Sequence, residues 1–295
     1  MSYTQYLRRG ENFEFSGDVE NFSELPSGVY EIEEGMFGLY LEKIQINTDS
    51  LVDLPDSTAD EVRSIVDLFL SGETKEAFSR YGILYKRGIL MYGPPGTGKT
   101  CIINQLIKTA EEKNMIVLLD AKPFWVSDVV ENIREIEGGS RTIMVIWEEF
   151  EKWTPWESNV LDLLDGIDQV DNVIYIAPTN YIDKIPERIR NRPSRFANVI
   201  EVGYPSAEVR RIFLESKIHK EDNVDIAQWV EATEGMTIDH LKDLIISVLV
   251  LKVPFPSALE KLKTMGGEAF SETTDEEIAE DCLIEKFATK SRLPS

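Results

Sequence analysis

The chain has 295 residues, 42% of them hydrophobic and 9% aromatic, which is enough for about two compact units of ~150 residues and excludes wholesale disorder. Lys and Arg total 31 against 53 Asp and Glu, a formal net charge of −22. Because a charge of this sign repels phosphate polymers and anionic lipid headgroups, it argues against nucleic acid or a membrane surface as the main partner.

The sequence also shows no targeting segment and few cysteines. The sequence has no apolar stretch of the ~18 residues that a spanning helix needs and no signal-peptide pattern, so we expect a soluble, cytoplasmic protein. Its two cysteines, Cys101 and Cys282, supply neither a disulfide framework nor a zinc cluster and are expected to act as small hydrophobic residues.

Residues 1–56 are acidic and contain two alternating stretches, 29–32 and 39–46, with Gly35 and Gly38 between them. Alternation predicts strands with one buried face, and the glycines favour a hairpin. We expect a β-rich N-terminal appendage over 1–56 that docks on the rest of the chain. A turn and helix-start signal at 54–57 then predicts a helix from about 58 to 71.

The middle of the chain alternates apolar runs of strand length with helical segments. The runs at 89–92, 116–119, 143–147 and 173–176 lack polar alternation, which predicts parallel strands covered on both faces and an α/β fold. Beyond Pro205 the apolar spacing is helical. We expect a large α/β unit over 57–204, a small helical unit over 205–256, and a C-terminal helix and tail over 257–295.

Residues 93–100, Gly-Pro-Pro-Gly-Thr-Gly-Lys-Thr, follow the first of these runs and precede a helical segment. They fit the phosphate-binding pattern G-x-x-x-x-G-K-[ST], and a strand before with a helix after argues against a chance match. Backbone N–H groups and the helix N-terminus would face the phosphates. Lys99 would reach the outer phosphates, and Thr100 would ligate Mg²⁺.

Polar side chains follow two further strands. Glu148 and Glu149 end the run at 143–147, where P-loop ATPases keep one acid for Mg²⁺ and one for the attacking water. Asn180 follows the run at 173–176, at the strand ends where open α/β sheets bind ligands. A solvated strand end and a simple turn are the alternatives that the residues alone leave open.

Four arginines, Arg188, Arg190, Arg192 and Arg195, lie within a short stretch of this acidic chain. Guanidinium groups suit bidentate contact with phosphate. A solvated charged face is the alternative interpretation.

Together these motifs resemble an AAA-type (AAA+) ATPase over about residues 54–250. Residues 85–100 resemble the strand and Walker A loop of the family, Asn180 matches its sensor 1, and residues 192–196 are similar to its Arg-Pro-Gly-Arg-Phe motif. The resemblance implies a P-loop sheet domain with a helical lid, and catalysis by Lys99, Glu149 and Asn180. It also implies that Arg192 and Arg195 act as arginine fingers on the neighbouring subunit's ATP, in a ring that is a hexamer by family default.

The resemblance also implies a nucleotide-binding set. Gly82 and Ile83 stand where family members hold adenine with backbone groups, and Ile238 and Asp239 replace a small pair near the base and ribose. His240 beside them is expected to be structural. The remaining expected ATP contacts are Pro94, Pro95, Gly96, Thr97, Gly98, Lys99, Thr100 and Cys101.

Two features refine the comparison. Glu148 replaces the usual Asp at the metal position, which the branch containing the mitochondrial Rieske-protein translocase tolerates, and residues 54–57 look like that branch and its bacterial and phage relatives. Trp125 and Val126 align with the pore loop by which threading members grip a polypeptide. The alternative for the aromatic residues there is anchorage in the core.

We therefore predict a ring-forming, Mg²⁺-dependent ATPase that remodels, unfolds or translocates a protein client, with the N-terminal 56 residues as a client or adaptor surface. A nucleotide-gated scaffold with weak hydrolysis, suggested by Glu148, and a DNA-linked motor are the alternatives. The net charge of −22 disfavours the second.

Overall fold

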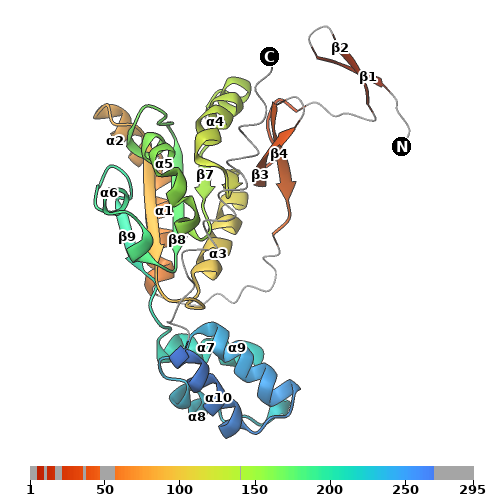
Figure 1. The fold of residues 1–295 in the computed structure, drawn as a ribbon, viewed down its shortest axis with the longest axis vertical. Helices are drawn as coiled ribbons and strands as arrows, with labels where there is room; N and C mark the ends of the chain where they lie inside the picture. The colour runs from red at the N-terminus through yellow and green to blue at the C-terminus, as the bar shows by residue number, and fades with distance from the viewer. Residues whose placement is uncertain are drawn as a thin grey trace.

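The computed structural model describes residues 5–9, 12–16, 22–35, 38–46, 57–139 and 141–268. The predicted turn at 54–56, the predicted tail beyond 268 and Cys282 lie outside these residues. Within them, a sheet covered by helices stands beside a separate group of helices (Figure 1). No helix in the described ranges is both long and apolar enough to cross a membrane.

The central sheet has seven strands in the order β4-β3-β6-β7-β8-β5-β9. Every neighbouring pair is parallel except β3 and β4, which are antiparallel. This confirms the predicted α/β class with a mostly parallel sheet. The strands are β3 (Gly28–Gly35), β4 (Gly38–Ile44), β5 (Lys86–Tyr92), β6 (Ile116–Leu119), β7 (Ile143–Ile146), β8 (Val173–Thr179) and β9 (Asn198–Glu201), and β1 (Gln5–Arg9) pairs with β2 (Asn12–Ser16) in a sheet of their own.

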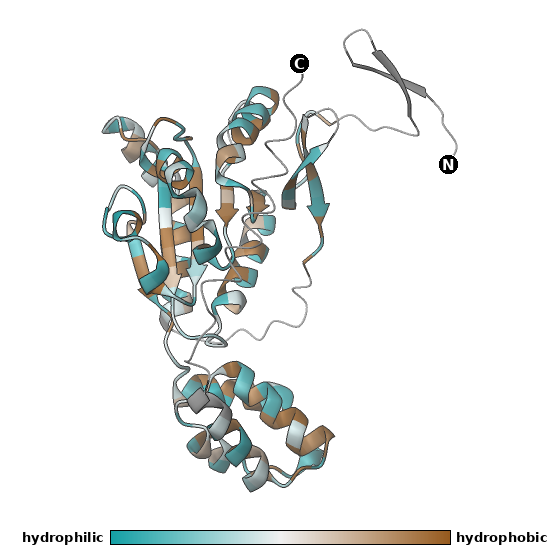
Figure 2. Cartoon of the chain, in the orientation of Figure 1, coloured by the Kyte–Doolittle hydropathy of each residue, from teal (hydrophilic) through white to brown (hydrophobic). Residues whose placement is uncertain are grey.

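Helices cover both faces of the sheet because its strands are apolar on both sides. One hydrophobic core joins the sheet to α4 and α5, and a second joins it to α1 and α3. Figure 2 shows the middle strands of the sheet mostly in hydrophobic colours and the helices beside them in a mixture of hydrophobic and hydrophilic colours. The helices of this part are α1 (Ser57–Phe69), α2 (Gly72–Arg80), α3 (Lys99–Glu112), α4 (Pro123–Glu137), η1 (Phe150–Trp156), α5 (Glu157–Asp165), η2 (Ile182–Lys184) and α6 (Glu187–Arg190).

The helices after β9 have a hydrophobic core of their own. They lie below the sheet in Figure 1, beyond the ends of the strands. They are α7 (Ala207–Lys217), η3 (Lys220–Asp222), α8 (Ile226–Ala232), α9 (Ile238–Ile245), η4 (Ile246–Val250) and α10 (Phe255–Glu268). We call this group the helical unit; the limits of the four predicted domains stay a proposal.

The N-terminal hairpin predicted from alternation and from Gly35 and Gly38 is confirmed as β3 and β4. Its first strand pairs in parallel with β6, with Val29 opposite Val117. Residues 28–44 therefore extend the central sheet. Alternate β3 side chains enter different cores, since Tyr30 and Ile32 join the α4–α5 core and Val29 joins the α1–α3 core.

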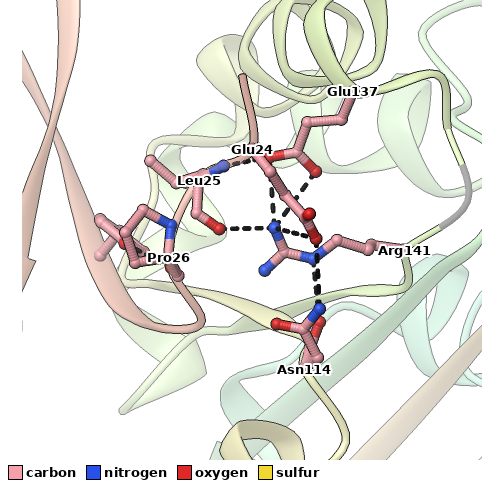
Figure 3. A network of polar contacts seen from close by, with 7 residues as sticks. Glu24, Leu25, Pro26, Asn114, Glu137 and Arg141 are labelled. Atoms are coloured by element: carbon pink, nitrogen blue, oxygen red, sulfur yellow. Dashed lines mark hydrogen bonds and ion pairs between the residues drawn. The ribbon is translucent and has the colours of Figure 1, made fainter. Parts of the chain in front are cut away.

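A buried polar network fastens the segment before β3 to the sheet (Figure 3). The Arg141 side chain, 9% exposed, forms an ion pair of 3.2 Å with Glu137 at the end of α4. Its guanidinium also donates to the carbonyl oxygens of Leu25 (2.5 Å) and Asn114 (2.9 Å). The Leu25 N–H donates back to Glu137 at 2.6 Å. One arginine thus joins three segments that are distant in sequence, around Leu25, Asn114 and Glu137.

We expect Arg141→Ala to lower the free energy of unfolding by about 3 kcal/mol, because it leaves the Glu137 carboxylate, 6% exposed, without its cation. Urea denaturation followed by circular dichroism measures the change. Lys113→Ala is the control, since it removes an exposed ion pair with Asp67 and should cost about 0.5 kcal/mol or less. Equal losses in the two variants would contradict the buried role.

Candidate functional site

The predicted phosphate loop connects β5 to α3, and its backbone requires glycine. Gly98 stands at the N-cap of α3 with φ 112°, a conformation that other residues rarely adopt. A Cβ atom on Gly93 would lie 2.1 Å from the Val202 carbonyl oxygen. The loop therefore packs closely against the chain after β9 and directs the first turn of α3 toward the carboxyl ends of the strands.

Lys99 lies in this first turn and is 7% exposed. Its ammonium donates to the carbonyl oxygens of Gly93 (2.6 Å) and Pro94 (2.8 Å). Burial lowers its pKa to about 8, against the opposing effect of Glu151. Among the described residues this ammonium has no ion pair within 4.0 Å. A buried cation with neutral partners fits an anionic ligand such as phosphate.

The loop opens onto a pocket of about 120 Å³. Its walls come from the start of α3 and from residues at the ends of β7 and β8, two strands that are neighbours in the sheet. Five residues predicted for catalysis or metal binding are brought together there. The lining residues are Lys99, Thr100, Ile103, Glu148, Glu149, Pro178, Thr179 and Asn180.

Two carboxylates close this pocket after β7. Burial raises the pKa of Glu148, and the charge of Glu149 adds to the effect. Glu149 has φ 49°, strained backbone of a kind that clusters at functional sites, and its carboxylate pairs with Lys152. No group of three or more His, Cys, Asp or Glu in the described ranges forms a metal cluster. Mg²⁺ binds through one or two carboxylates together with substrate phosphates, so Glu148 and the Thr100 hydroxyl are the groups here that could hold it.

The structure adds two acids that the sequence prediction missed. Asp120 follows β6 with φ 46°, and its Oδ1 accepts the Glu148 N–H at 2.7 Å. Burial raises its pKa to about 6, while the Glu148 N–H bond opposes the shift. Glu151 accepts a hydrogen bond of 2.6 Å from the buried Thr179 hydroxyl. Asp120 carried the same signal as Asn180, a polar residue directly after an apolar run, whereas Glu151 carried none.

A second pocket lies between the phosphate loop and the helical unit. The Ile238 N–H donates to the Gly96 carbonyl oxygen at 3.1 Å, and Asp239 lies beside the same glycine. His240 is structural, as expected, because its Nδ1 lies 2.6 Å from the Thr237 hydroxyl in a capping box. The pocket is lined by Ala59, Thr97, Gly98, Cys101, Ile102, Gln105, Val209 and Ile238.

The comparison with protein families identifies this region. The model of the ATPase family associated with various cellular activities (AAA) matches residues 89–204, from β5 to the end of the sheet. The chain contains an AAA ATPase domain. Membership of this family implies nucleotide binding, and the pocket described above lies within the matched residues.

Curated relatives support the assignment. The cell division cycle protein 48 homolog of Archaeoglobus fulgidus is 31% identical over 203 residues, covering 62% of this chain and 27% of that protein. The proteasome-activating nucleotidase of Saccharolobus solfataricus is 31% identical over 219 residues, covering 65% and 54%. The ATP-dependent zinc metalloprotease FtsH 2 of Thermoanaerobacter sp. is 27% identical over 254 residues, covering 76% and 46%. The chain thus spans between about a quarter and about half of these proteins.

Gly82 and Ile83, which were predicted to hold adenine, lie away from the phosphate loop. Both residues follow α2 and lie at the opposite end of β5 from the phosphate loop of the AAA domain. The seven residues of this strand span about 20 Å, which is the separation between the two sites. The Ile83 N–H already donates to the Phe78 carbonyl oxygen at 3.0 Å. The second pocket, by contrast, is lined by four of the residues predicted to contact ATP, Thr97, Gly98, Cys101 and Ile238.

The two predicted arginine fingers have different surroundings. Arg192 is exposed on the loop after α6. Arg195 is 7% exposed, and its Nε donates to Asp165 at 2.9 Å within the same subunit. Neither lines the pocket of its own chain. The Arg192 side chain therefore lies on the surface, whereas Asp165 holds the Arg195 side chain inside the domain.

The predicted loop at Trp125 and Val126 is a helix instead. Both residues lie in the first turn of α4, and Val126 is fully buried. Trp125 packs against the α4–α5 core, and the Lys122 ammonium stands 4.6 Å from the centre of its ring. The alternative of anchorage in the core, which was made for Phe124 and Trp125, describes Trp125. Phe124, which is 38% exposed, is the aromatic residue on the outside.

Proposed function

We propose that this chain is a Mg²⁺-dependent ATPase. The observation that carries the proposal is the single pocket that joins Lys99 and Thr100 of the phosphate loop to Glu148, Glu149 and Asn180. A buried lysine and paired acids beside a phosphate loop are the groups that phosphoryl transfer to water requires. The names of two relatives, a nucleotidase and an ATP-dependent protease, agree with this activity.

Each pocket residue has a role in the proposed reaction. Lys99 binds the outer phosphates, and Thr100 with Glu148 holds Mg²⁺, which when bound neutralises charge on the phosphate oxygens. Glu149 orients the attacking water and accepts its proton. Asn180 donates its amide to the γ-phosphate or the water. Asp120 holds the Glu148 backbone in place through the bond to its N–H.

We further propose that the active species is a ring, with a hexamer as the default. Arg192 is exposed and does not line the pocket of its own chain, so it contributes to catalysis when it reaches the pocket of a neighbour. The proposal also includes a protein as the client. It places the chain in the translocase branch, which tolerates Glu at the position of Glu148. The printed name of one relative, a proteasome-activating nucleotidase, supports a client that is a protein.

Phosphate release measured against protein concentration, with mass by light scattering, tests the proposal. We expect release per subunit to rise as the chain assembles, because the arginine comes from a second copy. The matched control is Lys99→Ala, which removes the buried cation from the phosphate loop and should abolish release. ATP-dependent assembly without phosphate release would favour the nucleotide-gated scaffold, and stimulation by DNA that salt abolishes would favour the DNA-linked motor.

A further inference from the structure

Glu149 has a cationic neighbour on its own chain. Lys152 lies in the first turn of η1, three residues after Glu149, and the ammonium pairs with Oε2 of that carboxylate. The Lys152 backbone N–H also donates to the Glu149 carbonyl oxygen at 2.8 Å. The hydrogen bond to Glu149 raises the pKa of Lys152, so the ammonium stays charged near neutral pH.

The turn that carries Lys152 is itself fixed in place. The adjacent Glu151 accepts the Thr179 hydroxyl at 2.6 Å and so ties η1 to the end of β8. The Thr154 hydroxyl donates to the Glu151 carbonyl oxygen at 2.9 Å, and Phe150 is buried in the core. The backbone on both sides of Lys152 is therefore held, which keeps the base of this side chain beside Glu149.

That position lies on the solvent side of the pocket. Lys152 is not among the residues that line the pocket, and its side chain is 64% exposed. The side chain of Glu149 is 54% exposed, so its paired oxygen faces a partner outside the pocket. An orienting carboxylate needs an oxygen within hydrogen-bond reach of the attacking water, and here one oxygen is engaged elsewhere.

We propose that Lys152 is a positioning residue that restrains the Glu149 carboxylate on the solvent side, so that hydrolysis requires this ion pair to open. The proposal rests on the ATPase activity proposed above. The pair turns the carboxylate toward η1 and engages one of its two oxygens. Nucleotide binding uses Lys99 and Thr100, which the pair does not touch, and is unaffected.

The test is Lys152→Ala in the full-length chain under conditions where the wild type assembles. We expect kcat for phosphate release to rise about two- to fivefold with KM unchanged, the size of effect that an exposed ion pair supports. Lys152→Arg keeps a cation at the same place and should restore the wild-type kcat. Lys113→Ala, which removes another exposed ion pair, is the matched control and should leave kcat unchanged.

The outcomes separate this inference from the proposed function. If the wild type hydrolyses ATP and Lys152→Ala has an unchanged or lower kcat, the proposed restraint is overturned and the proposed ATPase activity stands. A lower kcat would mean that the ammonium stabilises charge in the transition state. A rise in Lys152→Arg equal to that in Lys152→Ala also overturns it. A wild type that binds ATP and releases no phosphate overturns both proposals.

Discussion

Glu149→Gln should lower the rate of phosphate release at least about 100-fold while ATP still binds. Glutamine keeps the size of the side chain and a hydrogen-bonding oxygen, but it cannot accept the proton of the attacking water, and general base catalysis is typically worth about 10²- to 10⁴-fold. The phosphate-binding part of the pocket, Lys99 and Thr100, is left intact. Single-turnover phosphate release together with calorimetric titration of ATP measures the two effects separately.

Glu131→Gln is the matched control for this variant, because it makes the same change on the exposed surface of α4. It should leave both release and binding unchanged. Retention of more than about a tenth of the wild-type rate by Glu149→Gln would show that Glu149 is not the proton acceptor. Loss of ATP binding in the variant would instead assign Glu149 to the nucleotide site itself.

The part of the site that follows strand ends could be predicted from sequence alone. Glu148 and Asn180 directly follow buried apolar runs, and parallel strands carry such residues to one edge of a sheet. The structure brings both into one pocket with Lys99. Asp120 follows β6 in the same way, but no family motif pointed to it. The position of polar residues at strand ends therefore identifies a residue that the motifs do not.

Residues whose role depends on distant packing were not predictable in this way. Trp125 was assigned to a loop, yet the apolar residues that follow it continue as a buried helix face in α4. Ile83 lies only ten residues before the phosphate loop in sequence, but a fully extended strand separates them in space. A sequence alignment preserves the order of residues along the chain. It does not show at which end of a strand a residue lies.

The two arginines after α6 look equivalent in the sequence but differ in how they pack. Arg192 and Arg195 are three residues apart, and which of them is buried is decided by Asp165 on α5, thirty residues earlier. The Ser194 hydroxyl donates to the same carboxylate at 3.0 Å. This carboxylate fixes the end of the loop against the domain, while Arg192 stays on the outside.

Arg192→Ala should therefore impair catalysis, and Arg195→Ala should impair stability. Arg192→Ala should lower kcat by about 10³-fold, the usual value of an arginine supplied by a neighbour, and change the free energy of unfolding by less than about 0.5 kcal/mol because its side chain is exposed. Arg195→Ala should lower the free energy of unfolding by about 3 kcal/mol, since it leaves Asp165, 18% exposed, without its cation. Phosphate release and urea denaturation of both variants measure the four quantities.

Mixing experiments connect the first of these effects to assembly. An inactive Glu149→Gln subunit still presents Arg192, and an Arg192→Ala subunit still presents an intact pocket, so mixing the two should restore phosphate release in pockets that pair one with the other. No restoration, with light scattering showing mixed assemblies, would mean that Arg192 acts within its own chain or not at all. Arg195→Ala subunits give the contrast. If Arg195 only holds the loop, they should release phosphate without any mixing, whereas a loss of release that mixing with Glu149→Gln restores would mean that Arg195 also acts between subunits.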